Sequence, residues 1–223
     1  MANAFINNIR GKFGVVALGL AWATAVSVGL AWVNRYQMTP GAAAAATTRW
    51  PGATAVALAP DRDTLIMFVH PQCPCSRASL GELANVMARR GDRVLAYVAF
   101  FNPGGEPQTW SQTDLWRDAQ AIPGVKVLVD DDAALARRFG AATSGQVMLY
   151  NASGRLLFNG GITDSRGHFG DNAGEDAVVA LLKENAPPTT MPAVTPVYGC
   201  AIYTRQPLKM PAVVDSNSKV CPP

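Results

Sequence analysis

The stretch "TLIMFVHPQCPCSRASLGELANVM", residues 64–87, decides the fold. Residues 64–69 form a continuous apolar and branched run of strand length, which is typical of a strand covered on both faces. From Ser76 onward the apolar spacing becomes that of one face of a helix, and Gly91 predicts its end. Cys73 and Cys75 therefore stand between a buried strand and the start of a helix.

The remainder of the globular part repeats this alternation. Further strands are predicted at 94–101 and 125–129, and a hairpin at 147–150 and 155–158 with the turn residues 151–154 between its strands. Helices are predicted over 111–122, with Ser111 as N-cap, over 132–139 and over 175–184. This order predicts an α/β fold, a central mixed sheet with helices on both faces.

The residue between the two cysteines suggests how they differ. Pro74 suits the first position of a helix, where its missing N–H is not needed, and this predicts Cys73 as the N-cap. Unpaired backbone N–H groups and the positive end of the helix dipole then favour a thiolate. We expect a lowered pKa and a nucleophilic role for Cys73, with Cys75 as the resolving cysteine.

A disulfide between Cys73 and Cys75 would close a very small ring. Residues two apart lie about 5.5 to 7 Å apart at Cα, at the edge of the range that disulfides allow, and Pro74 stiffens the ring. A strained disulfide is easily reduced, so we expect a more oxidising pair than a relaxed disulfide gives.

A resemblance can now be named. The strand, Cys-Pro-Cys and helix, followed by "VDDDAALARRFGAATSGQVMLYNASGRLLFNGGI" (129–162), resemble the membrane-anchored TlpA-type branch of the thioredoxin superfamily, over residues 61–185. The resemblance implies a thioredoxin-like fold and thiol–disulfide exchange with cysteine-containing proteins and a redox donor or acceptor. Two features differ from the family: only one residue separates the cysteines, and Ser144-Gly145-Gln146 replaces the family's cis-proline before the hairpin.

The loop after the hairpin, residues 160–172, should hang over the cysteines, because the return strand ends at the same edge of the sheet. It contains Arg166 and His168, one of only two histidines in the chain. A positive charge there would stabilise a thiolate, and a neutral imidazole could move protons or bind metal. The alternative is a glycine-rich loop whose polar groups face water.

Two further cysteines, Cys200 and Cys221, lie in a proline-rich tail with too little periodicity for regular structure. Outside the cytoplasm the simplest expectation is a structural disulfide between them. In the alternative, "TPVYGCAI" (195–202) docks on the domain and presents Cys200 to Cys73.

The N-terminal part predicts a membrane anchor. Residues 13–33 carry no charge and are long enough, at about 1.5 Å per residue, to cross the hydrocarbon core. Basic residues are more frequent before this run than after it, which predicts a cytoplasmic N-terminus (1–12) and a domain outside. The resulting organisation has a linker (34–60) from which Trp50 docks, a thioredoxin-like domain (61–186) and a C-terminal tail (187–223).

This organisation predicts a single-pass protein of the inner membrane with its domain in the periplasm. A cleaved signal peptide is the alternative, because 42–46 offers small residues, although they lie far beyond the apolar run.

Other classes of function make different demands on the same residues. The net charge of +3 is spread thinly, which excludes a nucleic-acid surface. The oxidoreductase needs no cofactor. Two thiolates and an imidazole suit Cu(I), so a copper-binding chaperone for oxidase assembly, with Cys73, Cys75 and His168 as ligands, is the alternative. A third class is a thioredoxin fold that only binds a partner.

Overall fold

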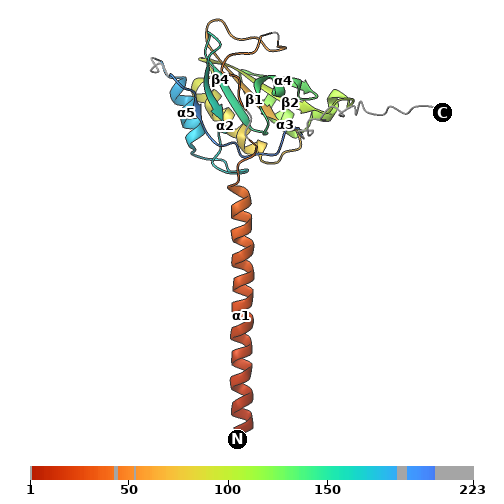
Figure 1. Cartoon of the computed structure of the whole chain (residues 1–223), viewed down its shortest axis with the longest axis vertical. Helices are drawn as coiled ribbons and strands as arrows, with labels where there is room; N and C mark the ends of the chain where they lie inside the picture. Colours follow the sequence, from red (N-terminus) through yellow and green to blue (C-terminus); the bar gives the residue numbers. More distant parts are fainter. Residues whose placement is uncertain (1, 43–44, 53, 185–189, 204–223) are drawn as a thin grey trace, which may run out of the picture.

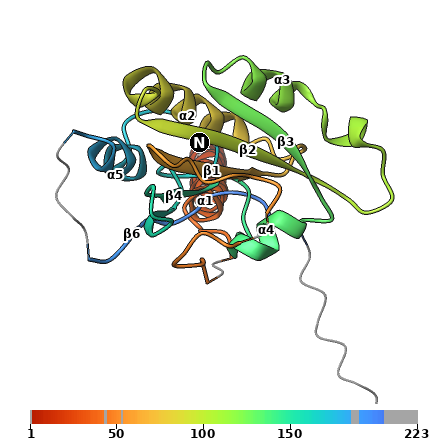
Figure 2. The same ribbon diagram turned by 90° about the horizontal axis from the view of Figure 1, so that it is seen from above.

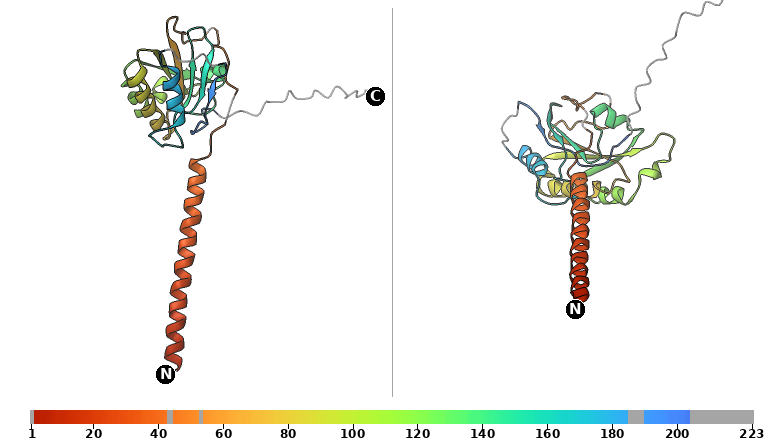
Figure 3. Two further views of the ribbon diagram at one scale, coloured as in Figure 1. Left: turned by 90° about the vertical axis from the view of Figure 1, so that its left-hand side faces the viewer. Right: turned by 60° about the horizontal axis from the view of Figure 1, so that its bottom comes forward.

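A computed structural model describes residues 2–42, 45–52, 54–184 and 190–203. The long helix α1 (Ala2–Gln37) extends away from a globular part, as Figures 1 and 3 show. Within it, Phe13–Gln37 is long and apolar enough to cross a membrane, with a mean hydropathy of 1.9, and its side chains are exposed. The helix therefore runs past both limits of the predicted span, 13–33.

The globular part is built on a six-stranded mixed sheet with the order β3-β2-β1-β4-β5-β6. The central strand β1 (Asp63–Val69) pairs in parallel with β2 (Val94–Asn102) and antiparallel with β4 (Gln146–Tyr150). Outside them, β3 (Val125–Asp131) is parallel to β2, β5 (Leu156–Gly160) is antiparallel to β4, and β6 (Ala193–Val194) is parallel to β5. The predicted strands and hairpin are confirmed.

Helices cover both faces of the sheet, as predicted (Figure 2). On one face, α2 (Ser76–Arg90), α3 (Asp114–Gln120) and α5 (Ala173–Leu181) pack on Leu65, Met67 and Val69 of β1. On the other, α4 (Ala134–Phe139) packs on Ile66 and Phe68. The alternation along β1 buries every side chain from Thr64 to Val69, because a central strand faces a hydrophobic layer on each side.

The linker docks on the face that α4 covers. The Trp50 ring packs edge-on against Phe139 and Tyr150, with ring centroids 4.9 and 5.2 Å apart. The Tyr150 hydroxyl donates to the carbonyl of Thr47 (2.9 Å). The docking predicted for Trp50 is confirmed, and the linker extends the core of this face.

Two predicted helix starts are wrong, for different reasons. Residues Gln108–Ser111 form a separate 3₁₀ turn, η1, so α3 begins only after Thr113. The helix predicted from Asp132 begins at Ala134, because Asp132 and Ala133 have positive φ angles of 51° and 53°. The buried Asp130 carboxylate accepts the first free N–H groups of α4 and fixes its start there.

The tail was predicted to lack regular structure, and this is wrong for its described part. Residues 193–202, called the tail segment below, form β6 at the sheet edge and then cross to Thr143, which makes an antiparallel bridge with Ala201. Ile202 is buried against the α4 face. Short pairings of this kind leave no periodic pattern in a sequence.

Candidate functional site

The two cysteines lie where β1 ends and α2 begins. The predicted helix start is correct at Ser76, and Gly91 ends the helix as expected. The predicted cap is wrong: Cys75, not Cys73, precedes the helix, and no side chain caps it. Ser76 N–H donates to the Cys73 carbonyl (3.1 Å), so Cys73–Pro74–Cys75 form a tight turn of 3₁₀ type before the first helical residue.

Cys73 is buried, with 1% of its surface exposed, yet its surroundings favour the thiolate. Burial raises the pKa of this thiol, but hydrogen bonds from the Cys200 thiol, the Ser76 hydroxyl and the N–H groups of Cys200 and Cys75 outweigh it. The resulting pKa is lowered, in the direction expected from the sequence. Fixed donors around the sulfur, rather than the helix dipole alone, produce this effect.

The Ser76 hydroxyl belongs to a chain of hydrogen bonds. His70 N–H donates to Ser144 Oγ (2.7 Å), and Ser144 Oγ lies 2.7 Å from Ser76 Oγ. Because Ser144 already accepts from a backbone N–H, its proton is available for Ser76, and the Ser76 proton is then available for Cys73. Ser144 belongs to the Ser144-Gly145-Gln146 stretch before β4, so this stretch supports the Cys73 sulfur through a hydroxyl.

The other two thiols differ from Cys73. Burial and the neighbouring Cys73 sulfur raise the pKa of Cys75. The same causes raise the pKa of Cys200 to about 12. Arg166 opposes both shifts by its charge. The site therefore holds one favoured thiolate, Cys73, between two sulfurs that keep their protons.

Arg166 connects the site to α1. Its guanidinium donates to the carbonyl of Gly199 (2.5 Å) and lies over the Tyr36 ring, 4.9 Å from the centroid. Its backbone N–H donates to the carbonyl of Gln37, the last residue of α1 (3.1 Å). The structure thus brings Arg166 to the cysteines, as the position of the 160–172 loop predicts.

His168 lies apart from this cluster. It is exposed, and its backbone N–H donates to the carbonyl of Ser165 (3.4 Å). Among the residues that the structure describes, no three His, Cys, Asp or Glu side chains are close enough to hold a metal ion. Cys221 lies outside the described residues, so the predicted Cys200–Cys221 disulfide stays a prediction. Cys200 lies beside Cys73, and its N–H donates to Cys73 Sγ (3.4 Å).

A hollow beside Cys73 opens between the cysteine turn and α3. It is lined by Pro71, Gln72, Cys73, Pro74, Arg77, Asp114 and Leu115. Arg77 crosses the rim to form ion pairs with Asp114 and Asp118. The hollow gives a place for a side chain that approaches Cys73.

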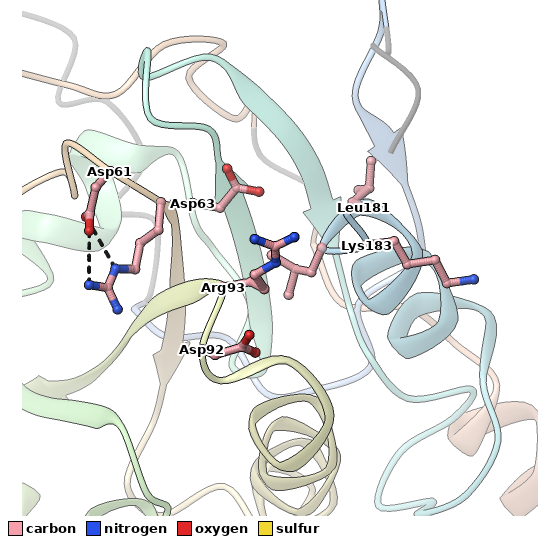
Figure 4. A pocket seen from close by; sticks show the side chains of 8 residues that line it. Asp61, Asp63, Asp92, Arg93, Leu181 and Lys183 are labelled. Atoms are coloured by element: carbon pink, nitrogen blue, oxygen red, sulfur yellow. Dashed lines mark hydrogen bonds and ion pairs between the residues drawn. The ribbon is translucent and has the colours of Figure 1, made fainter. Parts of the chain in front are cut away.

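A larger pocket lies at the opposite end of the sheet, where β1 and β2 begin (Figure 4). Acidic and basic side chains are mixed in its lining, together with two leucines: Asp61, Arg62, Asp63, Asp92, Arg93, Leu181, Leu182 and Lys183. It contains no cysteine or histidine and lies a full strand length from the thiols, so we do not assign the redox site there.

Sequence reasoning missed the roles of the Ser76 and Ser144 hydroxyls, and it gave the docking of Cys200 beside Cys73 only as an alternative. Serine at the start of a helix and in a turn is so common that neither hydroxyl stands out. For Cys200 the apolar Val197, Tyr198 and Ile202 around it gave a signal, but that signal did not outweigh the simpler pairing with Cys221.

The central strand is flanked in parallel by β2 and antiparallel by β4, with a cysteine pair at the start of α2. The fold is thioredoxin-like. No protein-family model matches the sequence. A search of the curated proteins gives no match.

Solved structures are similar to this chain at low sequence identity. An uncharacterised conserved protein from Geobacillus kaustophilus is 19% identical over 76% of this chain and 95% of its own, with a TM-score of 0.54. A hypothetical protein from Sinorhizobium meliloti is 22% identical over 75% and 96%, with a TM-score of 0.47. A secreted Mycobacterium tuberculosis disulfide oxidoreductase is 14% identical over 55% and 81%, with a TM-score of 0.39.

Proposed function

We propose that this protein is a membrane-anchored thiol–disulfide oxidoreductase that acts on cysteines of other proteins outside the cytoplasm. Cys73 is the nucleophile, and Cys75 is its partner in the first disulfide. One observation carries the proposal: a buried sulfur at the start of a helix is surrounded by hydrogen-bond donors that lower its pKa. A structural buried cysteine has its pKa raised instead, so these donors indicate reactivity.

The position of the cysteines relative to α1 supports client proteins that lie near the membrane surface. The cysteine end of the sheet is the end next to α1, because Arg166 bonds both to Gln37 and to the residue before Cys200. Basic residues before the apolar run favour an N-terminus in the cytoplasm, with the domain in the periplasm. A membrane-impermeant thiol reagent added to intact spheroplasts should label Cys75 if this orientation is correct.

We expect the Cys73–Cys75 pair to have a high reduction potential, so that its disulfide acts as an oxidant. Donors that stabilise the Cys73 thiolate stabilise the reduced form, and the small Cys-Pro-Cys ring destabilises the oxidised form. Both effects raise the reduction potential. We expect a value above that of thioredoxin, about −270 mV. A measured potential at or below that value would contradict this part of the proposal.

The central test uses the full-length protein in detergent with insulin as the disulfide substrate and dithiothreitol as the reductant. Cys73→Ser should reduce catalysed insulin reduction by at least about 1,000-fold, because it removes the nucleophile. The double variant Cys75→Ser/Cys200→Ser, which has no second thiol beside Cys73, should retain the first attack and accumulate a mixed disulfide with insulin when dithiothreitol is left out. Turnover that survives in Cys73→Ser would exclude the assigned nucleophile.

Copper binding stays an expectation from the sequence and needs its own measurement. The same preparations can be titrated with Cu(I) against a competing chelator. Binding that is lost in both Cys73→Ser and His168→Ala would favour the chaperone. Binding that ignores His168 would exclude the proposed ligand set.

A further inference from the structure

The tail segment binds beside the nucleophile like an added strand. Thr143 pairs with Ala201 in an antiparallel bridge, Ser144 N–H donates to the Cys200 carbonyl (2.8 Å), and Ile202 N–H donates to a carbonyl of the same edge (2.9 Å). This edge, residues 142–144, lies next to β4 and ends in the serine that supports Cys73. An extended client peptide that approached Cys73 could use the same backbone groups. The protein's own tail now occupies them.

Cys200 lies at the point of this segment that faces Cys73. Its N–H donates to Cys73 Sγ at 3.4 Å. Its neighbours on both sides are fixed: Arg166 holds the Gly199 carbonyl, and Ile202 is buried in the core. The approach of Cys200 to Cys73 is thus built into the docking of the segment.

We propose that Cys200 is a third redox cysteine, which takes over the disulfide of Cys73 from Cys75 and thereby closes the site with the tail segment. The inference rests on the proposed function, which supplies the Cys73–Cys75 disulfide. It goes beyond that function in assigning a second disulfide and an internal occupant of the client edge.

The step is an exchange that needs no outside oxidant. Cys200 loses its proton and its sulfur attacks Cys73 Sγ; the Cys73–Cys75 bond breaks, and the Cys73–Cys200 bond forms. The electron pair of the broken bond goes to Cys75, which takes up the proton. One disulfide and one thiol are present before and after. Relief of the small ring drives the exchange, because the loop closed by Cys200 is long and carries no such constraint.

Gly199 controls the position of the segment. A Cβ on Gly199 would lie 1.9 Å from the carbonyl oxygen of Ser144, so the backbones touch there without room for a side chain. Gly199→Ala should therefore lift Cys200 from the edge while all thiols remain. Gly52→Ala is a matched control, because nothing lies within 4 Å of the added Cβ.

The test maps disulfides in the full-length protein in detergent after mild oxidation with diamide and blocking of free thiols. Trypsin places Cys73 and Cys75 in peptide 63–77, Cys200 in 184–205 and Cys221 in 220–223. We expect 63–77 linked to 184–205 as the main product. A bond within 63–77 with Cys200 free, or a link between 184–205 and 220–223, would overturn the proposal.

Variants identify the partner and the role of docking. The link should persist in Cys75→Ser and disappear in Cys73→Ser and Cys200→Ser. In Gly199→Ala the yield of the link should fall at least about tenfold. In the reduced protein, a thiol-blocking reagent should modify Cys73 faster in Gly199→Ala than in the parent, because the covering segment is lifted. Gly52→Ala should match the parent. An unchanged yield in Gly199→Ala, with an unchanged circular dichroism spectrum, would refute the docking argument.

Insulin reduction separates this inference from the function on which it rests. Turnover that depends on Cys73, without a link between 63–77 and 184–205, would support the oxidoreductase and exclude a redox role for Cys200. A link without any turnover of insulin would remove the oxidoreductase and, with it, the assignment of a redox role to Cys200.

Discussion

The two ends of the central sheet use polar groups in opposite ways. At the open end, where β1 and β2 begin, carboxylates and cations alternate: Figure 4 shows Arg93 between Asp63 and Asp92, and Asp61 in an ion pair with Arg62. At the closed end, where β1 stops, the tail segment covers a sulfur surrounded mostly by neutral donors. The open end has more charge, and the closed end has the reactive group.

The difference between the two ends shows which kinds of group shift the pKa of a thiol. Charges in water are screened and mobile, so exposed ion pairs such as Asp61–Arg62 contribute little. Under a cover, hydroxyl, thiol and amide donors are fixed in place, and burial strengthens their effect on a thiolate. Changes at the closed end should therefore alter reactivity, whereas changes at the open end should alter only stability, and slightly.

Among substitutions that leave every cysteine in place, the largest effect on reactivity is expected at Ser76. Ser76→Ala removes a hydroxyl that favours the Cys73 thiolate, and a hydrogen bond to a charged group contributes about 1.5–3 kcal/mol, so reactivity at pH 7 should fall about tenfold or more. The thiolate absorbance of Cys73, titrated in a Cys75→Ser background, should show the cause. In the parent the pKa of Cys73 is lowered by these hydrogen bonds, and Ser76→Ala should move the titration midpoint upward.

The sign of the accompanying stability change follows from the same titration. The folded pKa of Cys73 is lowered, so its contribution to stability is present above the unfolded value and is lost as the pH falls through the folded pKa. Urea unfolding at several pH values should show a smaller loss in Ser76→Ala. An identical pH dependence in both proteins would contradict the hydrogen-bond account.

The next effect is expected at Gly145, which lies in the turn before β4. Gly145 has a φ of +88°, its N–H donates to the Phe68 carbonyl (2.8 Å), and an added Cβ would lie 2.7 Å from Ser79 Oγ. Gly145→Ala should lower the free energy of unfolding by at least about 1–2 kcal/mol, because an L side chain is strained at positive φ. Urea titration against Gly52→Ala measures it, and equal midpoints would show that the strain is absent.

The sequence predicted the parts of the fold that repeat a pattern. The buried run before Cys73, the helix from Ser76 to Gly91 and the hairpin all follow from residue spacing over several positions, and each is confirmed. The wrong starts of α3 and α4 depend on single turns. The start of α4 is set by the positive φ at Asp132, and a non-glycine residue gives no sign in the sequence of such a backbone conformation.

The site was predictable to the extent that it lies within one stretch of chain. Cys73 and Cys75 were found because strand, cysteines and helix are contiguous. Ser144 and Cys200 lie 71 and 127 residues after Cys73. Backbone pairing between distant segments brings them to the site, where Ser144 adds its hydroxyl. Such pairing depends on which edge of the sheet is free, and no local pattern of side chains records it.

The smallest effect is expected at the open end. Burial raises the pKa of Asp63, and Arg93 opposes the shift. A carboxyl whose folded pKa is raised loses stability as the pH rises through the unfolded and then the folded pKa, so ionised Asp63 weakly opposes folding at pH 7. Asp63→Asn should raise the free energy of unfolding at pH 7 by less than about 0.5 kcal/mol and leave insulin turnover unchanged. A changed turnover would mean that a charge at the open end alters the reactivity of Cys73 at the closed end. The contrast between the two ends of the sheet would then no longer hold.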